Sequence, residues 1–392
     1  MQNIGIVAEF NPFHNGHKHL IDTVKQNGNA IICVMSGNFV QRGDTAITDK
    51  FTRAKMAVLG GADLVVELPT PWAMSTAQNF ATGAIGILNN LGITDKIVFG
   101  SESGDISALK QTASIIKSDA FNNKINRQIS KVSSTFAAAR NEIFEKEYPL
   151  LASVLRSPND TLGVEYILAA ERVGFTGETD CVKRIGAAHD SAYTDITVSA
   201  SLIREKIKSG EFDEIAQFMP ESAAELLCSA PKSDIKKIEN AILCKLRIDF
   251  SGDKIPALPD ISEGIENRIK NAVLAATSLE ELFALAKTKR YTLSRIRRLC
   301  LSAFLGIDNG FFGKIPPYIR VLAFNKRGEE LLRQASKFSS SPIITKTNQL
   351  DLSDDFTRKV WECEVLSSDI YALTLDTPQK CGNEYYQKII KT

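Results

Sequence analysis

The residues best suited to chemistry lie close together near the N-terminus. The chain has only four histidines, and three of them, His14, His17 and His19, follow a short apolar run within the segment HNGHKH. A helix that begins here would direct free backbone N–H groups toward a ligand, and such groups attract phosphate. Imidazole rings can donate hydrogen bonds or carry charge, and Gly16 allows close approach of the backbone to a ligand. The segment therefore predicts a phosphate-binding site containing His14 and His17.

Such a site suits attack on an α-phosphate with pyrophosphate as the leaving group. This chemistry needs mainly positioning and neutralisation of the charge on the phosphoryl oxygens. The residues alone leave two alternatives open, because the histidines could simply occupy a helix start or could bind zinc. A zinc site would lack the i, i+4 spacing of HExxH and any nearby cysteine ligand, so we expect no metal site here.

The elements that must position this segment have an α/β pattern. Short runs rich in Val and Ile predict strands at residues 3–10, 30–36, 62–68 and 95–100. Helices are expected between them, at residues 17–26, 48–60 and 73–92. This alternation predicts a doubly wound, Rossmann-like parallel sheet with helices on both faces and ligands at the carboxyl ends of its strands.

The length of 392 residues favours two domains. We predict a catalytic domain at residues 1–220 and a mostly helical domain at residues 221–392, which ends in a small C-terminal α/β unit near residues 318–347. Residues 231–330 hold 18 Lys and Arg against 12 Asp and Glu, a local charge of +6 in a chain of net charge +1. The second domain is therefore expected to face a polyanionic partner.

Composition limits the class of protein. Hydrophobic residues make up 44% of the chain and charged residues 24%, as in globular proteins. No apolar run is long enough to cross a bilayer, and the start MQNIGIVAEF lacks the pattern of a signal peptide. The seven cysteines are scattered and form no CxxC pair, which predicts reduced thiols in the cytoplasm. No membrane association and no stable protein partner are indicated.

A basic stretch, KTKRYTLSRIRR, occupies residues 287–298 and contains no acidic residue. Arginine suits bidentate contact with phosphate, and a tyrosine ring can stack on an unpaired base. A helix flank would carry Arg290, Arg297 and Arg298 together only if the helix ran unbroken through Thr292 and Ser294. The alternative is an ordinary solvated face. We predict RNA contact by Lys287, Lys289, Arg290, Tyr291, Arg295, Arg297 and Arg298.

The segment HNGH, together with VSASLIR at residues 198–204, resembles the HxGH nucleotidyltransferase superfamily, whose second motif has the form ISSTxIR. The resemblance implies a second helix N-terminus that places Ser199, Ser201 and Arg204 near a triphosphate. On the residues alone, Ser199 could be only a helix N-cap and Arg204 only a solvated helix residue.

Longer blocks resemble the bacterial tRNA(Met) cytidine acetate ligase family. These blocks are GIVAEFNPFHNGH, MSGNFVQRGDTAITDKFTRAKMAVLGGADLVVELP, FGSESGD, SPNDTLGVEY and TKRYTLSRIRR, and they extend to about residue 300. The resemblance implies that ATP, with Mg²⁺, activates acetate as acetyl-adenylate. The acetyl group then passes to N4 of the wobble cytidine of elongator tRNA(Met), forming N4-acetylcytidine.

Carried over to this sequence, the resemblance implies that His14 and His17 are catalytic. It also implies a set of ATP-binding residues, namely Val7, Ala8, Glu9, Phe10, Asn11, Pro12, Phe13, His14, Asn15, Gly16, His17, Lys18, His19, Leu20, Gly100, Asn159, Arg184, Ser199, Ser201 and Arg204. Without it, Gly100 would be a strand-end turn, Asn159 a helix N-cap and Arg184 a surface arginine.

The segment after the second strand is also rich in polar residues. Gln41, Arg42, Lys50 and Arg53 could hold acetate or the departing pyrophosphate. For Arg53 we expect the wet face of an amphipathic helix instead.

Two other functions remain open. A small-molecule adenylyltransferase that makes a nucleotide cofactor would share HNGH and VSASLIR but would not need a basic helical domain. An RNA-binding protein whose nucleotide fold has lost activity is the third possibility, although the intact HNGH argues against it.

Overall fold

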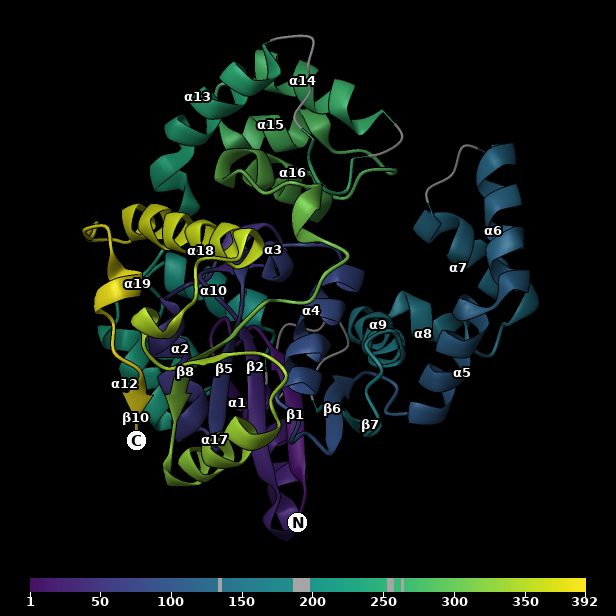
Figure 1. Cartoon of the computed structure of the whole chain (residues 1–392). Helices are drawn as coiled ribbons and strands as arrows, with labels where there is room; N and C mark the ends of the chain where they lie inside the picture. The colour runs from purple at the N-terminus through teal and green to yellow at the C-terminus, as the bar shows by residue number, and fades with distance from the viewer. Residues whose placement is uncertain (133–135, 186–197, 252–256, 262–263) are drawn as a thin grey trace.

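The computed structural model describes residues 1–132, 136–185, 198–251, 257–261 and 264–392 (Figure 1). At its centre lies a sheet with the strand order β10-β8-β5-β2-β1-β6-β7, in which β9 also pairs with β8. Its strands are β1 (Asn3–Ala8), β2 (Ala30–Ser36), β5 (Leu64–Leu68), β6 (Lys96–Ser101), β7 (Glu178–Lys183), β8 (Ile319–Phe324), β9 (Ile343–Ile344) and β10 (Ile390–Lys391). A separate hairpin consists of β3 (Phe39–Val40) and β4 (Asp44–Thr45).

The five strands β5, β2, β1, β6 and β7 run parallel to one another, as predicted. Strand β2 is buried along its whole length, and its side chains alternate between two hydrophobic cores: Ile32 and Val34 belong to one, and Ile31 and Cys33 to the other. Burial on both faces is typical of a parallel sheet between helical layers. The doubly wound α/β fold is therefore confirmed.

The helices that cover the sheet divide between its two faces. Helices α4 (Ala77–Asn90), α9 (Pro158–Arg172) and α17 (Lys326–Phe338) pack in the core that contains Ile32. Helices α1 (Asn15–Lys25), α2 (Lys50–Leu59), α10 (Ala200–Lys208) and α12 (Glu221–Ser229) pack in the core that contains Ile31. The short helices α3 (Thr70–Ala73) and α11 (Asp213–Ala216) complete these layers.

The C-terminal segment contributes strands to the same sheet. Strand β8 pairs antiparallel with β5, and β10 pairs parallel with β8. All six residues of β8 are buried. The sequence predicted a small α/β unit here, and the structure places its strands at the edge of β5, where they satisfy backbone groups that an open edge would leave unpaired. The domain boundary at residue 220 remains a prediction.

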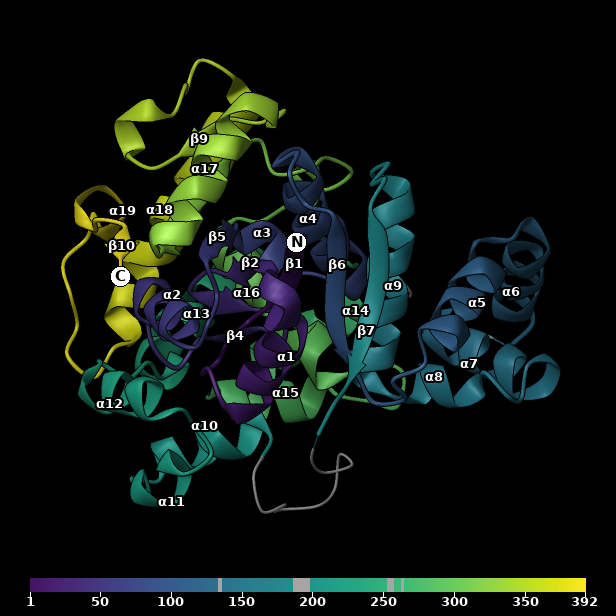
Figure 2. The ribbon, with the colours of Figure 1, turned by 90° about the horizontal axis from the view of Figure 1, so that it is seen from below.

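Two helical regions lie beside the sheet (Figures 1 and 2). The larger one shares its core with one face of the sheet and comprises α13 (Glu239–Phe250), α14 (Ile265–Ala275), α15 (Leu279–Ala286), α16 (Leu293–Leu305) and α18 (Asp355–Thr374). The short helix α19 (Asn383–Tyr386) contacts α18. The smaller one forms an outlying lobe with its own core around Phe121 and Phe144, and comprises α5 (Ile106–Lys117), α6 (Asp119–Val132), α7 (Phe136–Glu147) and α8 (Ala152–Arg156). Within the described residues, no helix is long and apolar enough to cross a membrane.

Candidate nucleotide site

The loop between β1 and α1 makes a tight turn into a capped helix. The peptide bond between Asn11 and Pro12 is cis, and His14 has extended backbone angles as the N-cap of α1. The backbone N–H of Gly16 donates to Nδ1 of His14 at 3.0 Å, and that of His14 donates to Nδ1 of His17 at 3.3 Å. The two histidines therefore cap the helix reciprocally, as Ser and Glu do in a capping box.

This capping determines which nitrogen of each ring can donate a hydrogen bond. Because Nδ1 of His14 and of His17 accepts a hydrogen bond, a neutral ring carries its proton on Nε2. The ring centroids lie 3.8 Å apart. Burial lowers the pKa of His14 to about 3, with further contributions from Arg184 and Arg204, and burial and His14 hold the pKa of His17 well below its usual range. At neutral pH the pair thus presents two uncharged Nε2–H donors.

A side chain at position 16 would displace the His14 ring. A Cβ atom there would lie 2.8 Å from Cε1 of that ring, so the ring would have to shift. A Cβ at Gly100 would meet Cγ of Arg184 at 3.4 Å, an ordinary contact. Gly100 lies near Arg184, whose backbone N–H donates to the carbonyl of Ser101 at 2.9 Å. These two predicted site residues therefore lie together at the carboxyl end of β6.

The second motif meets the first at this edge of the sheet. Ser199 is the N-cap of α10 and accepts from the backbone N–H of Leu202 at 3.2 Å. Arg204, one turn further on, donates through Nη1 to the carbonyl of Asn11 at 2.7 Å and through Nη2 to Oγ of Ser201 at 3.1 Å. Arg204 is thus not a solvated helix residue, since it ties the VSASLIR helix to the HNGH loop.

The charge around the histidines is positive. Arg184 and Arg204 are close enough to lower the pKa of His14, and Arg42 donates to Oγ of Ser201 at 3.1 Å. Among the ion pairs formed within the described residues, none involves these three arginines. The carboxylates of Glu9 and Asp44 are near enough to act on the charge of Arg204 but form no ion pair with it within the described residues. Three converging arginines suit a polyanion such as a triphosphate. No set of three or more His, Cys, Asp or Glu in the described part of the chain could hold a metal ion.

Asn159 lies in the first turn of α9, which begins at Pro158. Its side-chain Nδ2 and its backbone N–H donate to Oε1 of Glu102 at 2.6 and 3.1 Å. The neighbouring Asp160 is buried and accepts from the backbone N–H groups of Glu102 and Ser103 at 2.9 and 3.1 Å. Sequence reasoning missed these reciprocal hydrogen bonds between the two segments. The acidic residues in FGSESGD and SPNDTL, close to helix starts, were a signal for them. A nucleotide contact by Asn159 remains a prediction.

Comparison with known proteins identifies the family. Residues 1–385 match the family model described as HIGH Nucleotidyl Transferase. A tRNA(Met) cytidine acetate ligase of Thermoanaerobacter sp. (strain X514) is 37% identical over 407 residues, which cover 99% of each chain. A protein of the same name from Acetivibrio thermocellus is 35% identical over 414 residues, which cover 100% of each chain. This chain belongs to the tRNA(Met) cytidine acetate ligase family.

Solved structures with a similar fold agree with this assignment to the tRNA(Met) cytidine acetate ligase family. A crystal structure of Thermotoga maritima TmcAL bound with alpha-thio ATP has a TM-score of 0.90 and 29% identity, and covers 100% of this chain and 99% of its own. An apo form of the same protein has a TM-score of 0.92 and 30% identity, with the same coverage. The predicted family, fold class and assignment to an enzyme are confirmed.

Most of the other residues implied to bind ATP pack within or beside the loop between β1 and α1. The rings of Phe10 and Phe13 are buried, with centroids 5.1 Å apart, and Phe10 packs edge-on against His17 at 5.0 Å. The carboxylate of Glu9 accepts from the backbone N–H of Gln41 at 2.8 Å, and Lys18 pairs with Asp22. Contact with ATP remains a prediction for these residues and for Val7, Ala8, Asn11, Pro12, Asn15, His19 and Leu20.

The prediction of a wet helix face for Arg53 was wrong. Arg53 is 0% exposed, and its guanidinium donates to the carbonyls of Glu9 at 2.7 Å, Ser36 at 3.1 Å and Thr48 at 3.0 Å. The reason is that α2 begins directly at the carboxyl ends of the central strands, so its charged N-terminal turn is enclosed. Arg53 thereby joins the ends of β1 and β2 and holds the loop between β1 and α1 in place.

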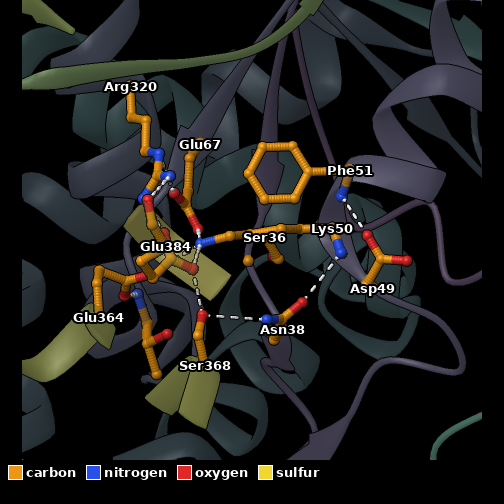
Figure 3. Close-up of polar contacts among 12 residues, drawn as sticks. Ser36, Asn38, Asp49, Lys50, Phe51, Glu67, Arg320, Glu364, Ser368 and Glu384 are labelled. Carbon is orange, nitrogen blue, oxygen red and sulfur yellow. Dashed lines mark hydrogen bonds and ion pairs between the residues drawn. The ribbon is translucent and has the colours of Figure 1, made fainter. Parts of the chain in front are cut away.

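Lys50 is also buried, within a network of charges (Figure 3). Its Nζ lies 2.5 Å from Glu67, 2.6 Å from Glu384 and 3.6 Å from Glu364, and Arg320 pairs with Glu384. Burial, together with the charge of Glu67, raises the pKa of Glu364 to about 7. Lys50 is therefore fully occupied by protein carboxylates, which makes it a poor candidate for binding acetate or pyrophosphate.

The basic stretch divides into exposed and engaged residues. Helix α16 begins at Leu293 with Thr292 as its N-cap, so Arg290 lies outside it and shares no helix flank with Arg297 and Arg298. Lys287 and Lys289 are exposed.

The rest of the stretch contacts the protein. The Tyr291 ring is only 7% exposed and has the guanidiniums of Arg290 and Arg295 within 5.8 and 5.7 Å of its centroid. Arg298 donates to the carbonyl of Gln41 and to Asp260, both at 3.2 Å. RNA contact remains a prediction for the whole stretch, and the exposure of Lys287 and Lys289 favours these two residues.

Proposed function

We propose that this protein uses ATP to activate acetate as acetyl-adenylate and then transfers the acetyl group to N4 of the wobble cytidine of elongator tRNA(Met). One observation carries the nucleotide half of this proposal: the HNGH loop and the VSASLIR helix meet around two imidazole donors and guanidinium groups that form no ion pair within the described residues. The names of the full-length relatives support the tRNA half.

In the first step, an acetate oxygen attacks the α-phosphorus of ATP. A new bond forms between oxygen and phosphorus, the bond from the α-phosphorus to the bridging oxygen breaks, and pyrophosphate leaves. The Nε2–H groups of His14 and His17 donate to phosphoryl oxygens whose negative charge grows in the transition state, and Arg184 and Arg204 offset that charge. Loss of one such donor typically costs about 100-fold or more in rate.

In the second step, the N4 amine of cytidine attacks the acetyl carbonyl carbon. The bond to the phosphate oxygen breaks, AMP leaves with the electron pair, and the amine loses one proton. This step requires the anticodon to reach the same loop. The exposed Lys287 and Lys289 are the residues we propose for contact with tRNA phosphates, through an attraction that weakens steeply with salt.

Mg²⁺ is proposed to arrive with ATP. The described residues include no carboxylate cage for a cation, so phosphate oxygens and water would supply its ligands. We further propose a cytoplasmic location, on the basis of the scattered cysteines. The small-molecule adenylyltransferase is disfavoured because ligases of this family match over nearly the whole chain, helical region included.

The test measures exchange of radiolabelled pyrophosphate into ATP with acetate present, followed by mass spectrometry of tRNA(Met) nucleosides after reaction with isotopically labelled acetate. We expect exchange without tRNA and a labelled acetylcytidine with it. Exchange that required a phosphorylated cofactor precursor in place of acetate would instead identify the small-molecule adenylyltransferase. Label in a nucleoside other than cytidine would contradict the tRNA half of the proposal.

A further inference from the structure

The β3–β4 hairpin lies between the loop that joins β1 to α1, residues 9–14, and the basic helix α16. Its turn, residues 41–43, contacts both of them. On one side the backbone N–H of Gln41 donates to the carboxylate of Glu9, at the end of β1, at 2.8 Å. On the other side the carbonyl of Gln41 accepts from Nη1 of Arg298 at 3.2 Å. The turn is therefore fixed from two directions.

Gly43 fastens this turn to α16. It has φ +70°, a conformation that L side chains rarely adopt, and a Cβ atom there would lie 2.6 Å from both Cβ of Arg297 and the backbone N of Arg298. The turn thus contacts the backbone of α16 directly. Between these two fixed residues, Arg42 is exposed and points its guanidinium at α10.

Arg42 and Arg204 share one partner. Nη1 of Arg42 and Nη2 of Arg204 both donate to Oγ of Ser201 at 3.1 Å. Burial lowers the pKa of Arg204 and the charge of Arg42 lowers it further, against the opposing charges of Glu9 and Asp44. No ion pair within the described residues involves either arginine. Two guanidiniums on one hydroxyl group repel each other, and a bound anion beside them would reduce that repulsion.

We propose that Arg42 is a further phosphate-binding residue of the nucleotide site, which contacts the polyphosphate end of ATP beside Arg204. This inference rests on the proposed function. Arg42 would stabilise the negative charge that develops on the departing pyrophosphate, whereas the imidazole pair would donate hydrogen bonds to the reacting phosphoryl group. The planar guanidinium provides two parallel N–H donors that match phosphate oxygens, and Ser201 orients them.

The test compares Arg42→Ala and Arg42→Lys with Arg333→Ala, a matched control on the exposed surface of α17. Since Arg42 is exposed, neither variant should alter the melting temperature by more than the control does. The measurements are the Kd for ATP, the kcat and KM of tRNA-independent pyrophosphate exchange, and the Kd for tRNA.

We expect Arg42→Ala to lower kcat/KM for ATP in the exchange reaction by about 100-fold, with weaker binding of both ATP and pyrophosphate. Arg42→Lys keeps the charge but loses the paired donors, so its loss should be on the order of tenfold. The affinity for tRNA should match that of Arg333→Ala.

Two results would overturn the inference: nucleotide binding and exchange by Arg42→Ala equal to those of Arg333→Ala, or a loss confined to tRNA affinity, which would assign Arg42 to RNA. Failure of the proposed function has a different signature. In that case the unaltered protein would show no acetate-dependent exchange, while weaker ATP binding by Arg42→Ala would still support the phosphate contact.

Discussion

Two groups of charged side chains lie near the carboxyl ends of the central strands, and they differ in how their charges are balanced. Around His14, the guanidiniums of Arg42, Arg184 and Arg204 form no ion pair within the described residues. Around Lys50 the charges are paired, because its ammonium group contacts Glu67 and Glu384, and Arg320 pairs with Glu384. The difference indicates that unbalanced charge marks a place for a ligand, whereas balanced charge holds the protein together.

The largest effect is expected in the balanced group. Lys50→Met removes one cation and leaves buried carboxylates unpaired, which should lower the free energy of unfolding by about 3–5 kcal/mol. Urea unfolding monitored by circular dichroism measures this loss. Lys55→Met, at a half-buried position of the same helix, is the matched control and should change stability little. A Lys50→Met protein as stable as the control would contradict a structural role for Lys50.

The next effect concerns the unbalanced group. His14→Ala should reduce acetate-dependent exchange by roughly 100- to 1,000-fold because an Nε2–H donor is lost. It also removes the N-cap of α1, which costs about 1 kcal/mol of stability. His14→Asn separates the two effects, since asparagine can cap the helix but lacks the ring. If exchange by His14→Asn equalled that of the unaltered protein, His14 would be a cap and nothing more.

A smaller effect depends on pH. The pKa of Glu364 is about 7 in the folded protein, against 4.5 ordinarily, so between these values the folded state holds a proton that the unfolded state has released. The contribution of Glu364 to stability should therefore fall as pH rises from about 4.5 to about 7, by at most about 3 kcal/mol, whereas the lowered pKa values of His14 and His17 act in the opposite direction. Glu364→Gln should remove the Glu364 contribution alone, so its urea midpoint should change differently between pH 5 and pH 8 from that of the unaltered protein. Parallel pH curves for the two proteins would rule out this titration.

The smallest effect is expected at the exposed end of the basic stretch. Lys287→Ala combined with Lys289→Ala should weaken tRNA binding and reduce the slope of log affinity against log salt by about 2, roughly one unit for each lost phosphate contact. Exchange without tRNA should be unaffected. An unchanged salt slope would remove these lysines from the interface. Arg298 is less suitable for this test, since its bonds to Gln41 and Asp260 support the hairpin.

The sequence predicted the elements and the helix start at HNGH well, because both depend on local pattern. The alternation of apolar runs located β1, β2, β5 and β6, and HNGH marked the start of α1. The carboxylates that enclose Lys50 could not be predicted in this way. Glu364 and Glu384 lie more than three hundred residues further along the chain, on helices whose own patterns give no sign of a charged partner.

The basic stretch was predicted less accurately, for a related reason. A run of like charges identifies a surface only when nothing else in the fold competes for the side chains. Here Asp260 and the carbonyl of Gln41 bind Arg298, and Tyr291 is covered by its arginine neighbours. Burial of one side chain in such a run depends on segments that approach from elsewhere, and local pattern does not encode that approach.

The late position of β8 and of Glu384 has a consequence for synthesis of the chain. While a ribosome is still translating the middle of the message, β5 has an open edge, and Lys50 and Glu67 have only each other as partners. The sheet therefore cannot be completed by β8 and β10 until nearly all of the polypeptide has emerged. Chaperones that shield unpaired strands would act on the nascent chain until then.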